Sequence, residues 1–323
     1  MKNITPFLTA LASMLVALLL AGPAQAFNSI SFVSSTGTST ICTRAAPCGN
    51  FQAAHDVTLE EGEIHCLDSG PFGVPGNLTT IAISVTIDCA DMGAVHTGSF
   101  VINGTGIIVT IRNLSFNNNS GIAGTSIDFQ SGAALHIENC VIQNLSHNSP
   151  YVGIKFRPSV PGAHLFVTDT IVKNSGTPIL GSIGGAIVVS PQSGGTAQVA
   201  LNRVTVAKNV FGIVADGTGS SGGINMTISD SVASGNSRDG VLAVTPSGGA
   251  PIGVMVTNTK LVNNAFGIRS IGPNVIVRAG DSTITGNGIG LSFSGGGTLL
   301  SYGTNKVQAN GSDGAFSGPV GLQ

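Results

Sequence analysis

The chain has 323 residues, a formal net charge of −2 and 9% charged residues, with 46 Gly, no Trp and 2 Tyr. An α/β enzyme of this length would carry many Lys, Glu, Leu and Ala on exposed helix faces, so the composition argues against that class. The charge pattern offers no basic stripe for phosphates, so nucleic-acid binding is not expected. Abundant Val, Ile, Thr, Ser, Asn and Gly are typical of strands and tight turns.

The first 26 residues have the pattern of a signal peptide. Lys2 precedes an apolar run from Leu8 to Leu20, and Ala24-Gln25-Ala26 fits the small-x-small cleavage rule. No second apolar run is long enough to span a membrane. We therefore expect export to a secreted or periplasmic location, with residues 27–323 as the mature β-rich domain.

The sequence has five cysteines, all in the first half of the chain: Cys42, Cys48, Cys66, Cys89 and Cys140. In an oxidising compartment we expect disulfides Cys42–Cys48 and Cys66–Cys89, although spacing alone leaves other pairings open. Cys140 lies in an alternating strand pattern, which favours a buried free thiol. A zinc site that uses His55 or His65 is the alternative, but no C-x-x-C spacing supports it.

Residues 27–100 are predicted to form a cap and the first coils of a repeat. The segment 50–57 is predicted to be a short helix with Phe51 and Ala54 on one face. A strand is predicted over residues 63–67. A repeat protein needs such a cap, because its first coil would otherwise expose apolar core and an unpaired strand edge.

From residue 101 onward the chain repeats one pattern, in which an alternating strand leads to an Asn and a Gly opens the next strand. The Asn series is Asn118, Asn144, Asn174, Asn209, Asn236, Asn264, Asn287 and Asn310. The Gly series is Gly153, Gly185, Gly212, Gly240, Gly267, Gly290 and Gly314. The Asn is expected to adopt left-handed backbone angles at a turn and to stack on its copies, and the Gly to permit a sharp corner.

Each repeat unit is expected to hold three short strands that pair in parallel with copies in the neighbouring coils. In the unit that begins at Gly240 they are Val241–Val244, Val254–Thr257 and Lys260–Val262. Variable loops such as residues 246–251 should project from one side. Aromatic-marked propeller blades, leucine-rich repeats, hexapeptide repeats and calcium-binding nonapeptides do not fit the sequence. The prediction is an all-β solenoid of about ten coils.

The segment PCGNFQAAHDVTLEEGEIHCLDSGPFG resembles the opening of pectate-lyase-like right-handed β-helix proteins. The rest of the chain, including HIENCVIQN, VTDTIVKN and DSTITGNG, resembles a group of secreted proteobacterial right-handed β-helix proteins without assigned activity. The resemblance covers nearly the whole mature chain. It implies a right-handed parallel β-helix with a short N-terminal capping helix, and it implies no particular activity.

One cluster of charged residues is a candidate site. If residues 127–129 stack under residues 154–156, Asp128 and Lys155 become outward neighbours, and Arg157 faces the same way. His136 and His164 belong to the same two coils. Such a cluster could bind an acidic sugar or abstract a proton, whereas a cross-strand salt bridge is the simpler interpretation.

The sequence therefore favours a non-catalytic secreted or envelope protein that presents a binding surface for a glycan or another surface partner. The alternative is a lyase or glycoside hydrolase acting on an acidic polysaccharide, which rests on fold analogy. No cofactor or metal is predicted, and the oligomeric state is left open.

Overall fold

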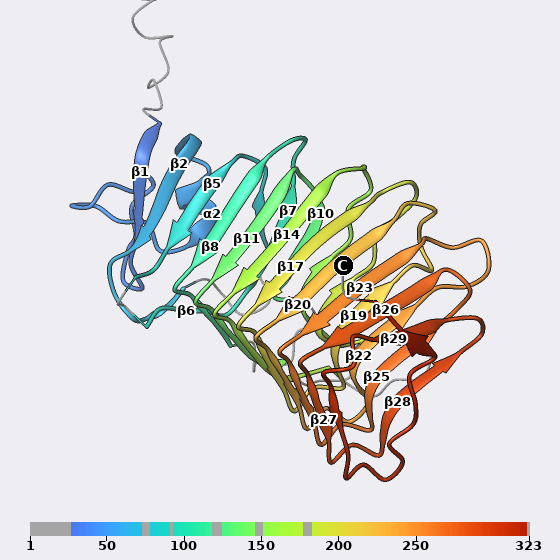
Figure 1. Ribbon diagram of the computed structural model, residues 1–323. Helices are drawn as coiled ribbons and strands as arrows, with labels where there is room; N and C mark the ends of the chain where they lie inside the picture. Colours follow the sequence, from blue (N-terminus) through green and yellow to red (C-terminus); the bar gives the residue numbers. More distant parts are fainter. Residues whose placement is uncertain are drawn as a thin grey trace, which may run out of the picture.

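The structure is a computed structural model that describes residues 27–72, 78–90, 93–117, 125–145, 151–176 and 183–321. The predicted signal peptide lies outside these residues. The described chain winds into a parallel β-helix with three sheets along its length (Figure 1). Sheet C holds nine strands in the described residues, so the solenoid has about nine turns, close to the predicted number.

The strands of each sheet stack in chain order. Sheet A contains β1 (Asn28–Val33), β2 (Thr58–Cys66), β5 (Val85–Asp88), β8 (Ile108–Arg112), β11 (Ala134–Glu138), β14 (Ala163–Thr168), β17 (Ala197–Asn202), β20 (Ile224–Ser229), β23 (Ile252–Thr257), β26 (Val275–Gly280), β29 (Thr298–Ser301) and β31 (Gly318–Pro319). Sheet B contains β3 (Pro71–Phe72), β6 (Val95–His96), β9 (Ser115–Asn117), β12 (Val141–Leu145), β15 (Ile171–Ser175), β18 (Thr205–Ala207), β21 (Val232–Ser234), β24 (Lys260–Val262), β27 (Thr283–Thr285) and β30 (Lys306–Val307). Sheet C contains β4 (Leu78–Ile81), β7 (Ser99–Asn103), β10 (Ile127–Ser131), β13 (Val152–Phe156), β16 (Gly185–Val189), β19 (Phe211–Asp216), β22 (Asp239–Val244), β25 (Phe266–Ile271) and β28 (Ile289–Ser294).

The predicted three-strand unit is confirmed. In the coil that contains Gly240, the third strand has the predicted bounds, and the first two begin two residues earlier than predicted. Residues alternate between core and solvent along the strands of sheet A, as in β23, where Ile252, Val254 and Val256 are buried. In sheet C, strands such as β16 are buried on both faces, because Val188, Val214 and Leu242 form a second apolar cluster. No helix in the described part of the chain is long and apolar enough to cross a membrane.

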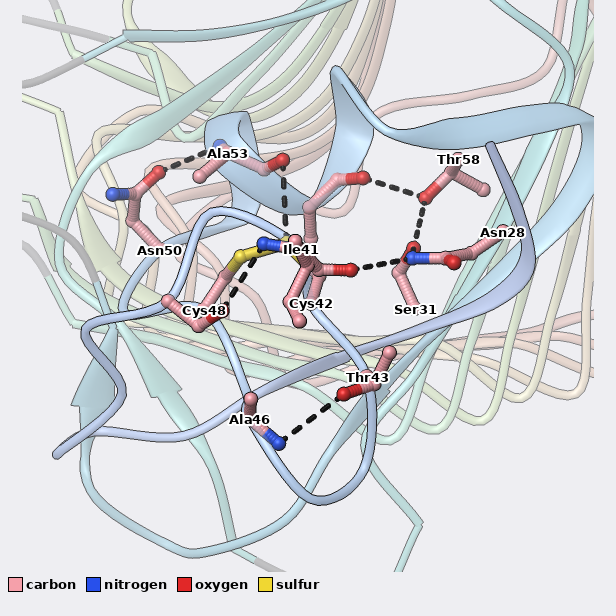
Figure 2. Close-up of a disulfide and its surroundings, with 12 residues drawn as sticks. Asn28, Ser31, Ile41, Cys42, Thr43, Ala46, Cys48, Asn50, Ala53 and Thr58 are labelled. Atoms are coloured by element: carbon pink, nitrogen blue, oxygen red, sulfur yellow. Dashed lines mark hydrogen bonds between the residues drawn. A yellow bond between two sulfur atoms is a disulfide. The ribbon is translucent and has the colours of Figure 1, made fainter. Parts of the chain in front are cut away.

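The N-terminal cap is also confirmed, with a shorter helix than predicted. Helix α2 (Phe51–His55) begins after Asn50, whose side-chain oxygen accepts a hydrogen bond from the Ala53 amide, and it buries Phe51 and Ala54. The disulfide Cys42–Cys48 closes a loop beside it (Figure 2). Backbone atoms of Cys42 and Cys48 pair with Phe32, so this loop covers the outer edge of β1.

The second disulfide, Cys66–Cys89, joins the end of β2 to the residue that follows β5. These strands are neighbours in sheet A, so the bridge ties the first coil to the next. Both disulfide pairings match the prediction. The four cysteines are therefore unavailable as thiolate ligands for a Cys/His zinc site. No group of three metal-binding side chains occurs within the described residues.

The corner between sheets B and C carries the predicted asparagine stack. The side-chain Nδ2 of Asn236 donates to Asn264 Oδ1 at 2.8 Å and to the Val206 carbonyl at 3.3 Å. Its Oδ1 accepts from the backbone N and the Nδ2 of Asn209 at 3.0 and 3.1 Å. The same pattern continues through Asn287 to Asn310, so each buried amide in the middle of the ladder has all of its hydrogen-bonding groups paired.

The predicted backbone role of these asparagines needs correction. Asn144 and Asn174 do adopt left-handed angles, with φ of 61° and 55°. Asn209, Asn236, Asn264, Asn287 and Asn310 do not, because the residue before each takes that conformation, as Lys208 does at φ 56°. The asparagines of the series therefore belong to two neighbouring positions. At one the side chain points outward and the backbone is left-handed, and at the other the side chain points inward and joins the hydrogen-bonded ladder. Asn118 lies outside the described residues.

The recurrent glycine is required by close packing and, except at Gly314, not by a left-handed backbone. A Cβ atom on Gly240 would lie 2.9 Å from Asn264 Nδ2 and 2.9 Å from the Gly267 carbonyl oxygen. Gly267 is equally crowded by Asn287 and Gly290. Glycine and asparagine recur together because the missing side chain leaves room for the asparagine of the next coil.

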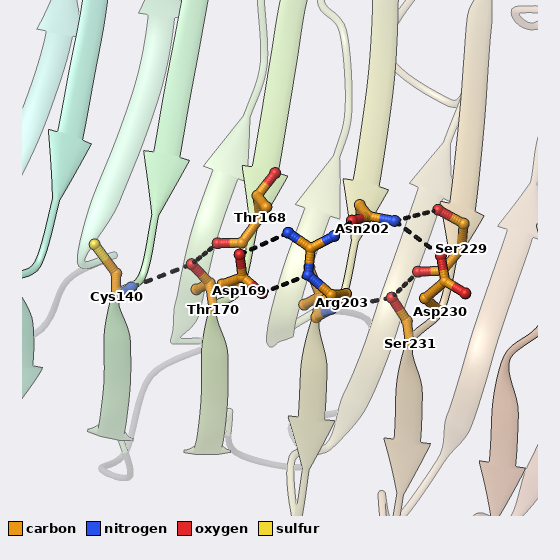
Figure 3. A network of polar contacts seen from close by, with 10 residues as sticks. Cys140, Thr168, Asp169, Thr170, Asn202, Arg203, Ser229, Asp230 and Ser231 are labelled. Atoms are coloured by element: carbon orange, nitrogen blue, oxygen red, sulfur yellow. Dashed lines mark hydrogen bonds and ion pairs between the residues drawn. The ribbon is translucent and has the colours of Figure 1, made fainter.

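A second internal ladder, which sequence reasoning missed, fills the corner between sheets A and B (Figure 3). Thr170, Ser231, Thr259 and Ser282 point inward, and each hydroxyl bonds the carbonyl two residues earlier. The Thr170 hydroxyl also accepts from the Cys140 amide at 3.3 Å (Figure 3). Cys140 occupies the same position one coil earlier, and its thiol contacts the Glu138 carbonyl at 3.3 Å. The buried free thiol is thus confirmed.

Loop length varies at two corners and not at one side as predicted. Residues 245–251 connect β22 to β23 between sheets C and A, where the next coil needs only residues 272–274. In earlier coils more residues separate a sheet B strand from the next sheet C strand, as for β9 and β10, which nine residues separate, most of them outside the described part of the chain.

Candidate functional site

The predicted charged cluster lies on the outer face of sheet C. Strands β10 and β13 pair in the predicted register, with Asp128 opposite Lys155. Arg157 donates two hydrogen bonds to Asp128, from Nε to Oδ1 at 2.8 Å and from Nη2 to Oδ2 at 2.6 Å. Gln130 Nε2 adds a third bond to Oδ2 at 2.9 Å. The carboxylate, whose side chain is 13% exposed, is therefore already paired.

The ion pair also determines the charge of Arg157. The hydrogen bond to Asp128 raises the pKa of the guanidinium above its ordinary value, and burial opposes this only in part. Arg157 therefore stays protonated and is a poor proton abstractor. The geometry of Asp128 and Arg157 corresponds to the simpler interpretation, a cross-strand salt bridge.

Lys155 is different, because it forms no ion pair within the described residues. It lines a groove of about 480 Å³ over sheet C together with Val188, Ser190, Gln192 and Asp216. Arg157 closes one side of this groove. Among the described residues, Lys155 is thus the one member of the predicted cluster that lines a groove and has no ion-pair partner.

The two histidines lie on a different sheet from this cluster. His136 belongs to β11 and His164 to β14, so both are in sheet A, while Asp128 and Lys155 are in sheet C. The expectation that a histidine would join the cluster is wrong. Residues of one coil separated by a corner face different sides of the solenoid, and the sequence had placed them by coil and not by sheet.

The histidines instead form an aromatic stack with Phe166 on the outer face of sheet A. His136 is the strand partner of Phe166, and the two rings stack with centroids 4.7 Å apart and planes 16° apart. The His164 ring is also nearly parallel, 5.9 Å from Phe166. Phe166 remains 37% exposed. Burial lowers the pKa of His136, the nearby Glu138 carboxylate opposes this in part and His164 adds to it, which favours the uncharged form of the His136 ring.

A groove of about 380 Å³ begins at this stack and continues along sheet A. It is lined by outward residues of five consecutive strands, β14 to β26, including Gln198, Asn225, Met255 and Arg278. Gly253 lies among them and contributes no side chain, which hollows an otherwise flat sheet face. With strands about 4.8 Å apart, four strand-to-strand steps correspond to a length of about 19 Å.

Sequence reasoning missed this groove, although a signal was present. In AHLFVT the alternating pattern places Phe166 on the outward side, next to His164. Two ring side chains at outward positions of the same strand, His164 and Phe166, are the signal that the sequence offered. The amide and arginine partners come from three later coils, and only the strand register brings them together.

The comparisons with known proteins find no match in sequence and a distant match in structure. No protein-family model and no curated protein matches the sequence. Among solved structures, the chain is similar to a crystal structure of the pectate lyase Pel9A, with a TM-score of 0.39, 14% sequence identity, and coverage of 88% of this chain and 72% of that chain. At this identity the likeness is one of fold alone.

Proposed function

We propose that the protein is an exported, non-catalytic polysaccharide-binding β-helix whose ligand lies in the groove along sheet A. The observation that carries the proposal is the stack of His136, Phe166 and His164 at one end of that groove. The stack presents a flat apolar surface, and the apolar face of a sugar ring can pack on it. Two disulfides are consistent with an extracellular location.

The rest of the groove supplies polar groups suited to hydroxyls. Gln198 and Asn225 offer amide donors and acceptors, and Arg278 offers donors in a fixed planar arrangement. A groove with an apolar platform and a few convergent polar groups is the usual composition of a small-ligand site. Its length of about 19 Å suits an extended chain of several sugar units running along the solenoid axis.

The experiment is a binding screen of the mature protein against immobilised neutral and acidic glycans. We expect saturable retention that falls at least tenfold in Phe166→Ala. Phe293→Ala is the matched control, because Phe293 is another exposed phenylalanine (43%) that lies on sheet C in the last coils. Equal retention of Phe166→Ala and wild type would show that the ligand binds elsewhere.

The alternative function is a lyase that acts on an acidic polysaccharide in the groove over sheet C. It is favoured by Lys155, a cation in a groove without an ion pair among the described residues. The test is release of unsaturated ends from carboxylated polysaccharides by wild type and by Lys155→Ala. Release that disappears in Lys155→Ala would favour the lyase, and loss of retention in that variant would move the binding site to sheet C.

A further inference from the structure

Four of the seven arginines in the described residues form ion pairs, whereas none of the five lysines there does. Every ion pair within the described residues has an arginine or a histidine as its cation. The five lysines in the same part of the chain have neither an ion pair nor a hydrogen bond from the ammonium group. One of them is Lys155 in the sheet C groove. The other four are Lys173, Lys208, Lys260 and Lys306.

These four lysines lie on one side of the solenoid, although the sequence spreads them over more than a hundred residues. Lys173, Lys260 and Lys306 are on strands β15, β24 and β30 of sheet B, and Lys208 directly follows β18. Lys260 and Lys306 both pair with Thr283, from opposite sides. From β15 to β30 there are five strand-to-strand steps, so the four lysines, the lysine stripe, extend about 24 Å along the axis. They are staggered across sheet B, because Lys173 is in register with Ser234 and Val262, two residues further along the strand than the position that Lys260 and Lys306 share.

The surroundings of this lysine stripe are neutral and polar on sheet B itself. Outward neighbours include Thr205, Ser234 and Thr285, and the sheet B strands from β9 to β30 contain no Asp or Glu in their described residues. Along the corner with sheet A, however, the stripe is bounded by carboxylates at Asp169, Asp230 and Asp281, of which Asp169 is paired with Arg203 (Figure 3). The uncompensated positive charge is therefore confined to the width of sheet B.

We propose that the lysine stripe binds a linear acidic polysaccharide, whose carboxylate or sulfate groups follow the solenoid axis. Charge complementarity favours an anionic ligand, and free ammonium groups about one or two coil spacings apart match charges repeated along a chain. The threonine and serine hydroxyls between the lysines can bond sugar hydroxyls. This surface is separate from the groove on sheet A and extends the proposed function to a second face.

Two other polyanions fit less well. A membrane surface would bring anionic headgroups against the flanking carboxylates as well as against the lysines, because the sheet B strands are only two to five residues long. Single-stranded nucleic acid is usually held by aromatic side chains on which bases stack. The described outward residues of the sheet B strands from β12 to β30 include no aromatic side chain.

The test measures binding of the mature protein to heparin and to alginate, as sulfated and carboxylated probes, at several salt concentrations. The stripe variant combines Lys173→Gln, Lys260→Gln, Lys306→Gln and Lys208→Asn, with asparagine at residue 208 because its φ of 56° favours that side chain. We expect the stripe variant to bind at least tenfold more weakly and with a shallower salt dependence. Lys155→Gln, which removes a lysine from another face, should bind like wild type.

Three results would overturn the inference. The first is unchanged binding of a stripe variant that unfolds at the wild-type temperature. The second is an equal loss in Lys155→Gln. The third is tighter binding to anionic vesicles or to single-stranded DNA than to either polysaccharide. The sheet A groove is tested separately with a neutral glycan, whose retention should fall in Phe166→Ala and stay unchanged in the stripe variant, so failure of that groove and failure of the lysine stripe give different results.

Discussion

Asn236 shows how a single side chain holds neighbouring coils together. Its amide accepts two hydrogen bonds from the preceding coil and donates one to Asn264 in the following coil. The buried position leaves no water to replace a lost partner. The ladder therefore depends on an amide at this position, and neither a carboxylate nor an apolar side chain can supply the same two donors and two acceptors.

We predict that Asn236→Ala lowers the free energy of unfolding by about 3 kcal/mol, because it leaves buried groups of two neighbouring coils unpaired. Asn225→Ala, at an exposed position on sheet A, should change it by less than about 0.5 kcal/mol. Equilibrium denaturation of both variants checks this. Equal effects at the two positions would mean that the ladder does not stabilise the solenoid.

His96 makes the stability of the first coils depend on pH. It is buried among Phe51, Phe100 and Phe116, its Nδ1 faces the Phe72 carbonyl at 3.2 Å, and its Nε2 has no partner in the described structure. Burial lowers its pKa to about 4, and the Phe72 carbonyl opposes this. The unfolded chain binds the proton more readily, so this contribution is complete above about pH 6.5 and is lost as the pH falls toward 4.

We predict that wild type loses up to about 3 kcal/mol more stability than His96→Met between about pH 7 and pH 4. Methionine has a similar volume and is apolar, so it fills the site without titrating. The measurement is the free energy of unfolding of both proteins at several pH values. Parallel curves would show that His96 is protonated inside the folded protein at little cost.

At the scale of elements, the cap at the first coil protects the edge of sheet A. The loop closed by Cys42–Cys48 pairs with β1, and Cys66–Cys89 ties β2 to the next coil. The two bridges close loops of different length, with sequence separations of 6 and 23. Loop-closure entropy therefore assigns the larger stabilisation to the second bridge.

We predict that replacing both Cys66 and Cys89 by Ala lowers the unfolding free energy by about 3 kcal/mol, and replacing Cys42 and Cys48 by about 2 kcal/mol. Cys140→Ser should cost less than either, because serine and threonine fill the same corner position in later coils. Thermal unfolding of the three variants gives the order. A larger loss for Cys42 and Cys48 would mean that covering the edge of β1 matters more than chain entropy.

The sequence predicted these elements well where local chemistry repeats. The strands of the Gly240 unit and the capping helix follow from local patterns in the sequence. Both disulfides have the expected pairing, although cysteine spacing alone left other pairings open. The hydroxyl ladder was missed because residues of different types, Cys140, Thr170 and Ser231, fill the same corner position in different coils. The sheet A groove was missed because its residues share a face only through register across five strands.

At the scale of the whole molecule, stacked side chains of neighbouring coils fill the interior, and the outer faces remain available for ligands. Arginines pair with carboxylates across coils, as Arg157 does with Asp128 and Arg269 with Asp239. The lysines, the exposed Phe166 and the two grooves are what remain on the surface. Sequence spacing could not reveal this division, because it depends on which sheet each residue joins after a corner.

The most direct test of the account is a titration of protein labelled with ¹³C at the methionine methyl groups, using a glycan that the binding screen retains. Met255 lines the groove on sheet A, and its resonance can be assigned with Met255→Leu. If the glycan binds in the sheet A groove, the Met255 methyl signal shifts in a saturable way, with the same midpoint as binding. Phe166→Ala then moves this midpoint to higher glycan concentration. Saturable glycan binding that leaves the Met255 signal unchanged would contradict it.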